Sequence, residues 1–282
     1  GESPLAQVLF IVRVQDPRAP VEVTAEELEA EIAEATRPWS EGLRAALLEA
    51  QGEEAGVRLL ARFGTAFPIS YQEQTAPRAA VADIARMAAL ERDGVTLSVP
   101  LSRPLGIRAE RLRLKLIQAD QRAALADVLP VLENLGLRTL AEDAHLVADR
   151  EGRAFWLHDF EVEPVVPGSF DLDRIGSRFE AAFRRIFLGE IENDGFNRLV
   201  LAAGLDADQI VTLRAICKYQ LQVGLTFSQP YVEQTLAANP ELARELVALF
   251  QARFDPQAAG DRAAAEAAAV ARIDTALTKV AV

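Results

Sequence analysis

The chain has 282 residues, enough for two domains of ordinary size, and half of them (50%) are hydrophobic, so it can bury a core. It carries 30 Lys and Arg against 42 Asp and Glu, and this formal net charge of −12 would repel the phosphates of nucleic acids. No stretch approaches the ~18 unbroken apolar residues of a membrane helix, and the first residues lack the pattern of a signal peptide.

The cysteine content and the first residue bear on where the protein works. Cys217 is the only cysteine, so no internal disulfide can form, which fits a reducing cytosol. The chain does not begin with Met, and we expect it to be an excised piece of something longer. We therefore predict a cytoplasmic protein with no nucleic-acid or membrane partner.

The first third of the chain predicts one strand followed by helices. Residues 6–14 (AQVLFIVRV) are apolar and rich in Val, so we assign residues 1–20 to a strand of a preceding or shared sheet. Residues 21–94 predict a helical segment, which Thr24 and Glu27 open with the spacing of a capping box. Within it we expect a break at 37–38, helices over 53–63 and 78–92, and a loop over 67–77.

A strand and a short helix are expected next. Residues 111–118 (RLRLKLIQ) alternate as a half-buried strand does, with Leu112, Leu114 and Leu116 on one face and Arg111, Arg113 and Lys115 on the other. The following helix contains Pro130. If Asp127 is its N-cap, Pro130 falls in the first turn, where no backbone N–H is needed, and Gly136 ends the helix. This start predicts a helix of about two turns.

The region 95–168 predicts a small α+β sandwich. Residues 138–149 and 153–164 are typical of two hairpin strands joined by 150–152. With the preceding strand and helix they make a βαββ unit, in which a helix covers one face of an antiparallel sheet. The fold class is therefore α+β, with helical segments on either side of the sandwich.

Residues 169–282 predict an all-α C-terminal half. Asp206 and Gln209 have the spacing of a second capping box. Three apolar stripes have helical spacing: Phe179, Phe183, Ile186 and Phe187; then Ile210, Leu213, Ile216, Cys217 and Leu221; then Leu242, Leu246, Leu249, Phe250 and Phe254.

Few residues offer recognisable chemistry. No glycine is followed by another two residues on, so neither a dinucleotide fingerprint nor a P-loop is present. His145 and His158, the only histidines, are expected to face each other across the hairpin; a metal site is one interpretation and two ordinary sheet residues the favoured one. Cys217 next to Lys218 allows an activated thiol, but its place on an apolar stripe favours a buried structural cysteine.

Two further patterns have a structural alternative that is favoured. Glu190, Glu192 and Asp194 resemble a carboxylate cluster, but their spacing lacks the frame of a calcium loop and fits a solvated turn. Residues 194–224 have the outline of a DNA-reading helix-turn-helix. A recognition helix presents basic and amide side chains at its N-terminal end, whereas Asp206 and Asp208 stand there, so a corner between packed helices is favoured.

Six blocks of the sequence carry a family resemblance. They are FPISYQEQTAPRAAVADI (67–84), DVLPVLENLGLRTL (127–140), FWLHDFEV (155–162), DGFNRLVLAAGL (194–205), RAICKYQLQVGLTFSQPYV (214–232) and LFQARFDP (249–256). In this order they resemble the large, bacterial type of NAD-specific glutamate dehydrogenase. No block is a catalytic motif, but together they span almost the whole chain.

The resemblance implies a parent enzyme that oxidises L-glutamate to 2-oxoglutarate and ammonium with NAD. This chain would be the end of its noncatalytic region, inactive alone and without a cofactor of its own. Residues 95–168 would form an ACT-like domain, of a type that often binds amino acids as allosteric effectors, and 169–282 a helical connector. The partners would be the catalytic domain of the same chain and the sister subunits of a homotetramer. A scaffold that binds no small molecule is the alternative.

The lysines agree with an inactive segment. A glutamate dehydrogenase needs a dinucleotide site and a catalytic lysine. The only lysines here are Lys115, Lys218 and Lys279, and none has a glycine-rich setting.

The ACT-like interpretation also predicts an effector site and a missing strand. ACT-type precedent implies binding at the loop after the first strand and at the C-terminus of the helix, which correspond to Gln118, Ala119, Asp120, Gln121, Asn134 and Gly136. Ordinary surface turn residues are the alternative. A complete βαββαβ sandwich needs a fourth strand, and we expect it from 95–99 or from 6–14.

Overall fold

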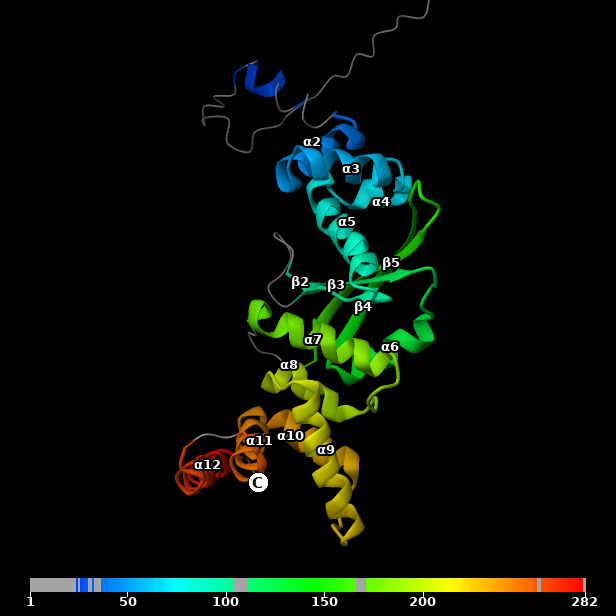
Figure 1. The fold of residues 1–282 in the computed structure, drawn as a ribbon. Coiled ribbons are helices and arrows are strands. Elements are labelled where there is room, and N and C mark those ends of the chain that lie inside the picture. Colours follow the sequence, from blue (N-terminus) through cyan, green and yellow to red (C-terminus); the bar gives the residue numbers. More distant parts are fainter. Residues whose placement is uncertain are drawn as a thin grey trace, which may run out of the picture.

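The computed structural model describes residues 24, 26–29, 32, 37–103, 111–165, 171–257 and 260–280. A five-stranded sheet, antiparallel at every pairing, lies in the middle of the molecule, with helices on both of its faces and a helical C-terminal region (Figure 1). The predicted α+β class is confirmed. The strand expected over 6–14 lies outside the described residues.

Helices cover one end of the molecule. Thr24 and Glu27 form the predicted capping box, since each backbone N–H donates to the other's side chain. The helices that follow are α2 (Trp39–Gln51), α3 (Glu53–Phe63), α4 (Ile69–Gln74) and α5 (Pro77–Arg92). The predicted helix over 53–63 and the break before Trp39 are confirmed.

The loop predicted over 67–77 is wrong, because α4 occupies most of it. A helix of six residues is too short to show an apolar period, and Pro68 and Pro77 on either side suggested a turn. Packing stabilises it instead. Tyr71 is only 1% exposed, and its hydroxyl donates to the carboxylate of Asp83 on α5 at 2.5 Å.

The sheet has the order β1-β3-β5-β4, with β2 also paired to β3. Its strands are β1 (Leu97–Ser98), β2 (Leu101–Ser102), β3 (Leu112–Ala119), β4 (Leu137–Ala148) and β5 (Ala154–Pro164). The predicted hairpin and the alternation along β3 are confirmed. β1 and β2 pair with the two ends of β3, so they form one edge strand that Pro100, which has no N–H to donate, interrupts.

The α+β sandwich has the strand order of a ferredoxin-like fold, with its edge strand taken from a different place in the chain. After β5 the chain forms α7 (Leu172–Phe187), which packs beside α6 as the second helix of a βαββαβ unit would. The edge strand beside β3 then comes from before the first strand rather than after the second helix. Of the two expected sources, 95–99 contains β1.

The helix α6 (Leu125–Asn134) differs from its prediction at the start. Its N-cap is Ala124, not Asp127, so the helix has ten residues and Pro130 lies inside it. Pro130 cannot donate to the carbonyl of Ala126, and both residues are exposed, so water can reach this interruption. The end is as predicted, since Gly136 follows the helix with a φ of 85°.

Helices continue to the end of the described chain. After α7 come η1 (Gly195–Arg198), α8 (Leu199–Ala203), α9 (Ala207–Gln222), α10 (Gln229–Ala238), α11 (Pro240–Phe254) and α12 (Arg262–Leu277). Asp206 and Gln209 form the predicted capping box of α9. The α7 stripe is buried as predicted at Phe179, Phe183 and Ile186. On α11 the buried centre is Ala243 and Val247, while Phe254 of the predicted stripe is 64% exposed.

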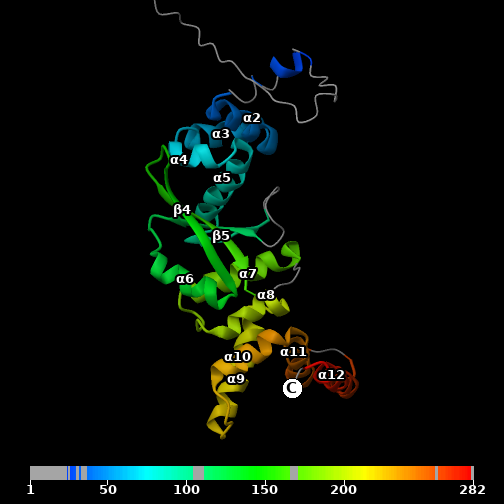
Figure 2. The same ribbon diagram turned by 180° about the vertical axis from the view of Figure 1, so that it is seen from behind.

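Two hydrophobic cores lie on opposite faces of the sheet. Leu114 and Phe160 face α6 and α7 in a core that continues into α8, α9 and α11. Ile117 and Phe155 face α2, α3 and α5 in the other core. Figure 2 shows the two groups of helices on either side of the β4–β5 hairpin. Within the described residues, no helix has the length and apolar character needed to cross a membrane.

Candidate functional site

Four of the predicted effector residues are consecutive: Gln118 and Ala119 end β3, and Asp120 and Gln121 begin the loop after it. Gln118 is 9% exposed, and its Oε1 has no hydrogen-bond partner among the described residues. Asp120 has a φ of 64°, which is unusual for a residue other than glycine, and its carboxylate lies 3.4 Å from Arg153 in the turn between β4 and β5. Gln121 is exposed beside it. A buried acceptor and an exposed carboxylate therefore stand two residues apart where β3 ends.

The other two predicted residues lie at the far end of α6. The side chain of Asn134 donates to Oδ1 of Asn193 at 3.0 Å, and Gly136 makes the turn into β4. Ten helical residues separate this end from the loop after β3, a distance of about 15 Å. Within one chain the structure does not bring the two groups together.

The two histidines do not face each other, so that prediction is wrong. In the hairpin register His145 is opposite Leu157 and His158 is opposite Ala144, which puts the two rings on opposite faces of the sheet. His145 contacts Ser70 at 3.3 Å, and burial lowers its pKa. His158 is fully buried, with Nδ1 at 2.7 Å from Oε1 of Glu142. A register one residue from the expected one separates them.

A buried polar cluster lies between α4, α5 and the sheet. Asp83 accepts hydrogen bonds from the Tyr71 hydroxyl and from the ammonium of Lys115. Lys115 also lies 3.8 Å from Asp159, which accepts from Arg113 at 2.6 Å. Burial and the charge of Asp83 raise the pKa of Tyr71, so its phenol stays protonated. Each polar end thus meets a partner, and the cluster fastens helices to strand β3.

The acidic cluster of the sequence makes ion pairs. Asp194 pairs with Arg214, whose Nε lies at 2.7 Å and whose side chain is 2% exposed. Glu192 pairs with Lys218 at 2.6 Å, and this bond lowers the pKa of Glu192. In the described part of the chain, no three His, Cys, Asp or Glu side chains gather closely enough to hold a metal ion. These carboxylates join the start of η1 to α9.

The helix pair 194–224 is a packed corner. Gly204 ends α8 in the left-handed conformation, with a φ of 65°. Asp206 caps α9, and Asp208 pairs with Arg185 at 2.8 Å. Cys217 is 5% exposed, and burial raises its pKa, which fits the predicted structural thiol. Asp206 thus caps the helix and Asp208 makes an exposed ion pair.

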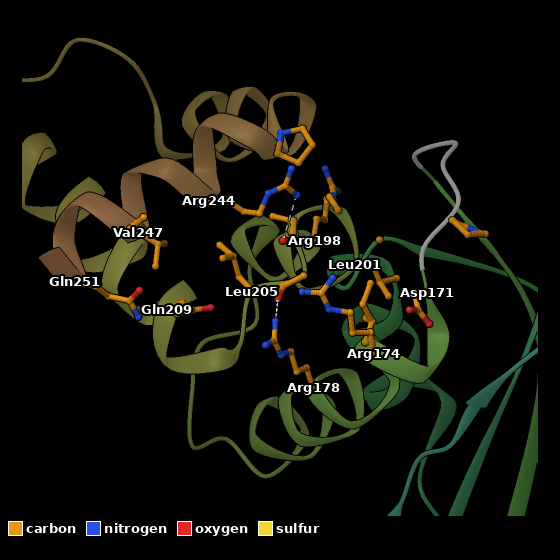
Figure 3. A pocket seen from close by; sticks show the side chains of 18 residues that line it. Asp171, Arg174, Arg178, Arg198, Leu201, Leu205, Gln209, Arg244, Val247 and Gln251 are labelled. Atoms are coloured by element: carbon orange, nitrogen blue, oxygen red, sulfur yellow. Dashed lines mark hydrogen bonds between the residues drawn. The ribbon is translucent and has the colours of Figure 1, made fainter. Parts of the chain in front are cut away.

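A cavity of about 680 Å³ opens between α7, α8 and α11. Gly136, at the end of α6, forms part of its wall. Its apolar wall includes Ile175, Leu201, Leu205 and Val247, and its polar lining includes Arg174, Arg178, Arg198 and Arg244. Figure 3 shows the arginine side chains converging on this space from α7, η1 and α11.

This cavity could not be predicted from the sequence. Its arginines come from three separate segments, so no local spacing connects them. The only local signal is the spacing of Arg174 and Arg178. They stand four residues apart, so they lie on the same face of a helix.

Four models of domains in one enzyme match the chain in order. They are described as glutamate dehydrogenase ACT2 domain (residues 1–40), helical motif 2 (46–90), ACT3 domain (96–175) and helical motif 3 (191–256). The chain belongs to the large NAD-specific glutamate dehydrogenases. It corresponds to a segment of them that contains ACT and helical motif domains.

Curated relatives with the name NAD-specific glutamate dehydrogenase match nearly the whole chain. The protein of Halomonas elongata is 38% identical over 91% of it, and that of Pseudomonas aeruginosa 39% identical over 90%. The protein of Mycobacterium tuberculosis is 31% identical over 97%. The chain spans 16% to 18% of the length of these relatives.

The domain matches place the cavity within this glutamate dehydrogenase segment. The ACT3 match holds the whole sheet, α6 and the start of α7, including Arg174. Helical motif 3 holds η1 and α8 to α11, including Arg198 and Arg244. The arginine-lined cavity therefore lies where these two regions meet.

Proposed function

We propose that this chain is a noncatalytic regulatory segment of an enzyme that oxidises L-glutamate to 2-oxoglutarate and ammonium with NAD. The observation that carries the proposal is the two-sided packing of the sheet. The region matched by ACT3 packs against helical motif 2 on one face and, through α6 and α7, against helical motif 3 on the other. A displacement of its strands would reach both sets of helices, because packed cores transmit strain.

The lysines support a noncatalytic role. Each of the three is held by a carboxylate: Lys115 by Asp83, Lys218 by Glu192 and Lys279 by Glu241. A lysine that acts on substrate lies in a pocket that admits the substrate, and none of these three lines the arginine-lined cavity. With no glycine fingerprint either, the residues present do not fit a nicotinamide dinucleotide, and no step of the oxidation is assigned to them.

A polar contact across the edge strand supports mechanical coupling. Glu180 of α7 accepts from the backbone N–H of Val99 at 2.8 Å and from Ser98 at 2.6 Å. It also pairs with Arg86 of α5 at 2.9 Å. Helices on the two faces of the sheet are thus joined through one carboxylate at its edge.

The end of β3 and the loop after it remain our proposed effector site. Gln118 offers a buried acceptor without a protein partner, and Asp120 offers a carboxylate to the ammonium of an amino acid. We further propose that the segment works in the cytoplasm, where the catalytic domain of its own chain and the other subunits of a homotetramer are its partners.

Calorimetric titration of the chain with glutamate, aspartate, arginine and NAD tests this function. We expect saturable heat from one amino acid, with affinity at least tenfold weaker in Asp120→Ala. Asp127→Ala is the matched control, because Asp127 is an exposed carboxylate at the third residue of α6. This variant should bind as the parent does. Tight binding of NAD would contradict the noncatalytic role. Silence from all four would favour a scaffold that assembles subunits without a ligand, which the two-sided packing also allows.

A further inference from the structure

The arginines of the cavity are more numerous than its carboxylates. Among the described lining residues four are arginines, and Asp171 is the only one with a negative charge. The Asp171 side chain is engaged by the N–H of Asp173, where it caps α7. In a chain with a formal net charge of −12, this is a local concentration of positive charge inside a concave, partly apolar space.

Part of this charge has a structural use. Arg178 donates to the carbonyl of Gly204, and Arg244 donates to the carbonyl of Ala203 at 3.4 Å, so both satisfy the C-terminal end of α8 (Figure 3). A guanidinium carries five N–H donors, so one such bond leaves most of each fork available.

The other two arginines have donors without a use in the fold. Within the described residues the guanidinium of Arg174 makes no hydrogen bond or ion pair, and Nε of Arg198 is buried without a partner. A buried donor left unpaired costs about 1–3 kcal/mol, and four cations in one space repel each other. An anion in the cavity would remove both penalties.

We propose that this cavity binds a small organic polyanion that carries carboxylate or phosphate groups. Arginine forks match the paired oxygens of both groups, and four forks suffice for two anionic groups. The side chains of Ile175, Leu205 and Val247 offer an apolar wall for a carbon skeleton. A volume of about 680 Å³ falls among pockets that enclose small molecules, which run from about 300 to 1,000 Å³.

The cavity is separate from the amino-acid site proposed where β3 ends. Of the predicted effector residues, only Gly136, at the other end of α6, also lines the cavity. A polyanion here would contact Arg174 of the ACT3 match and Arg198 and Arg244 of helical motif 3 together. Its binding would stabilise one relative position of these two regions.

Calorimetric titration of the chain with citrate and with ADP, at fixed ionic strength, tests the inference. Citrate represents carboxylates and ADP represents phosphates, so the tighter binder identifies the class. We expect saturable binding of at least one, with affinity at least tenfold weaker in Arg174→Gln and in Arg244→Gln. Because the side chain of Arg174 has no partner among the described residues, its variant should fold as the parent does.

Arg58→Gln is the control, because Arg58 is an exposed arginine of α3 whose side chain is 70% accessible. It should leave both affinities unchanged. The absence of a binding heat with both citrate and ADP at millimolar concentration would overturn the inference. So would binding that persists in both cavity variants, or binding that Arg58→Gln weakens as much as they do, since that would be attraction by surface charge.

Discussion

The buried contact between Asp83 and Lys115 shows how single residues join helix to sheet. Asp83 is 4% exposed, and the ammonium of Lys115 and the hydroxyl of Tyr71 both donate to it. Asp159 lies farther from the same ammonium, at 3.8 Å. Most of the neutralisation of this buried cation therefore comes from one carboxylate on α5.

Asp83→Ala should lower the free energy of unfolding by about 3 kcal/mol, because it leaves a buried cation and a buried phenol without their acceptor. Urea denaturation measures the loss. Glu241→Ala breaks the exposed pair with Lys279 and should cost about 0.5 kcal/mol or less. Equal losses in the two variants would show that the buried contact contributes no more than a surface pair.

At the scale of elements, α2 and α3 approach each other closely at Gly56. A Cβ at this position would lie 3.0 Å from the carbonyl oxygen of Leu47 and from the Cα of Leu48. Both are backbone atoms of α2, so neither can rotate away. The crossing of the two helices therefore depends on the missing side chain.

Gly56→Ala should lower the free energy of unfolding by about 1–3 kcal/mol, since the helices must separate to admit the methyl group. Gly176, inside α7, is the matched control, because a Cβ there meets nothing within 4 Å. Gly176→Ala should raise stability by about 1 kcal/mol through helix propensity. Thermal denaturation measures whether each variant is more or less stable than the parent. Higher stability in both variants would rule out the close approach at Gly56.

Which elements the sequence could predict follows from their length and period. The helix Glu53–Phe63 and strand β3 are long and regular, so their patterns sufficed. The helix α4 is six residues long and leaves no period to detect. The start of α6 was misplaced because Asp127 is a good N-cap, whereas the actual cap, Ala124, has no side-chain signal. Tertiary packing, and not a local sequence pattern, determines both the presence of α4 and the start of α6.

The cavity shows what no local pattern can reveal. Arg174, Arg198 and Arg244 stand on different elements, and only the packing of α7 and of α11 against α8 brings them together. The loop after β3 could be located from the sequence, because a strand and a helix bound it. That its partners Asn134 and Gly136 lie a helix length away follows from the true extent of α6.

At the scale of the whole molecule, one sheet belongs to two cores. Phe155 faces α2 to α5, while Phe160, five residues along the same strand, faces α6 and α7. A strand cannot lose its packing on one face and keep its register on the other. The two cores should therefore unfold together.

Phe155→Ala should lower the free energy of unfolding by about 3–5 kcal/mol, because it leaves a hole in a fully buried position. Hydrogen exchange should become faster in α7 as well as in α5, although α7 does not share a core with Phe155. Phe254→Ala, at a 64% exposed position, should change neither. Faster exchange confined to α2 to α5 would mean that the cores are separate units.

The permuted edge strand also affects how the protein can form on the ribosome. In an unpermuted sandwich the edge strand beside the first strand is made last, so the sheet stays open until synthesis of the domain is complete. Here β1 and β2 precede β3, and every strand of the sheet has been made once Pro164 is added. The edge neighbours of β3 are therefore already synthesised when β3 itself is made. The helices from α7 onward therefore emerge onto a sheet whose strands can already be paired.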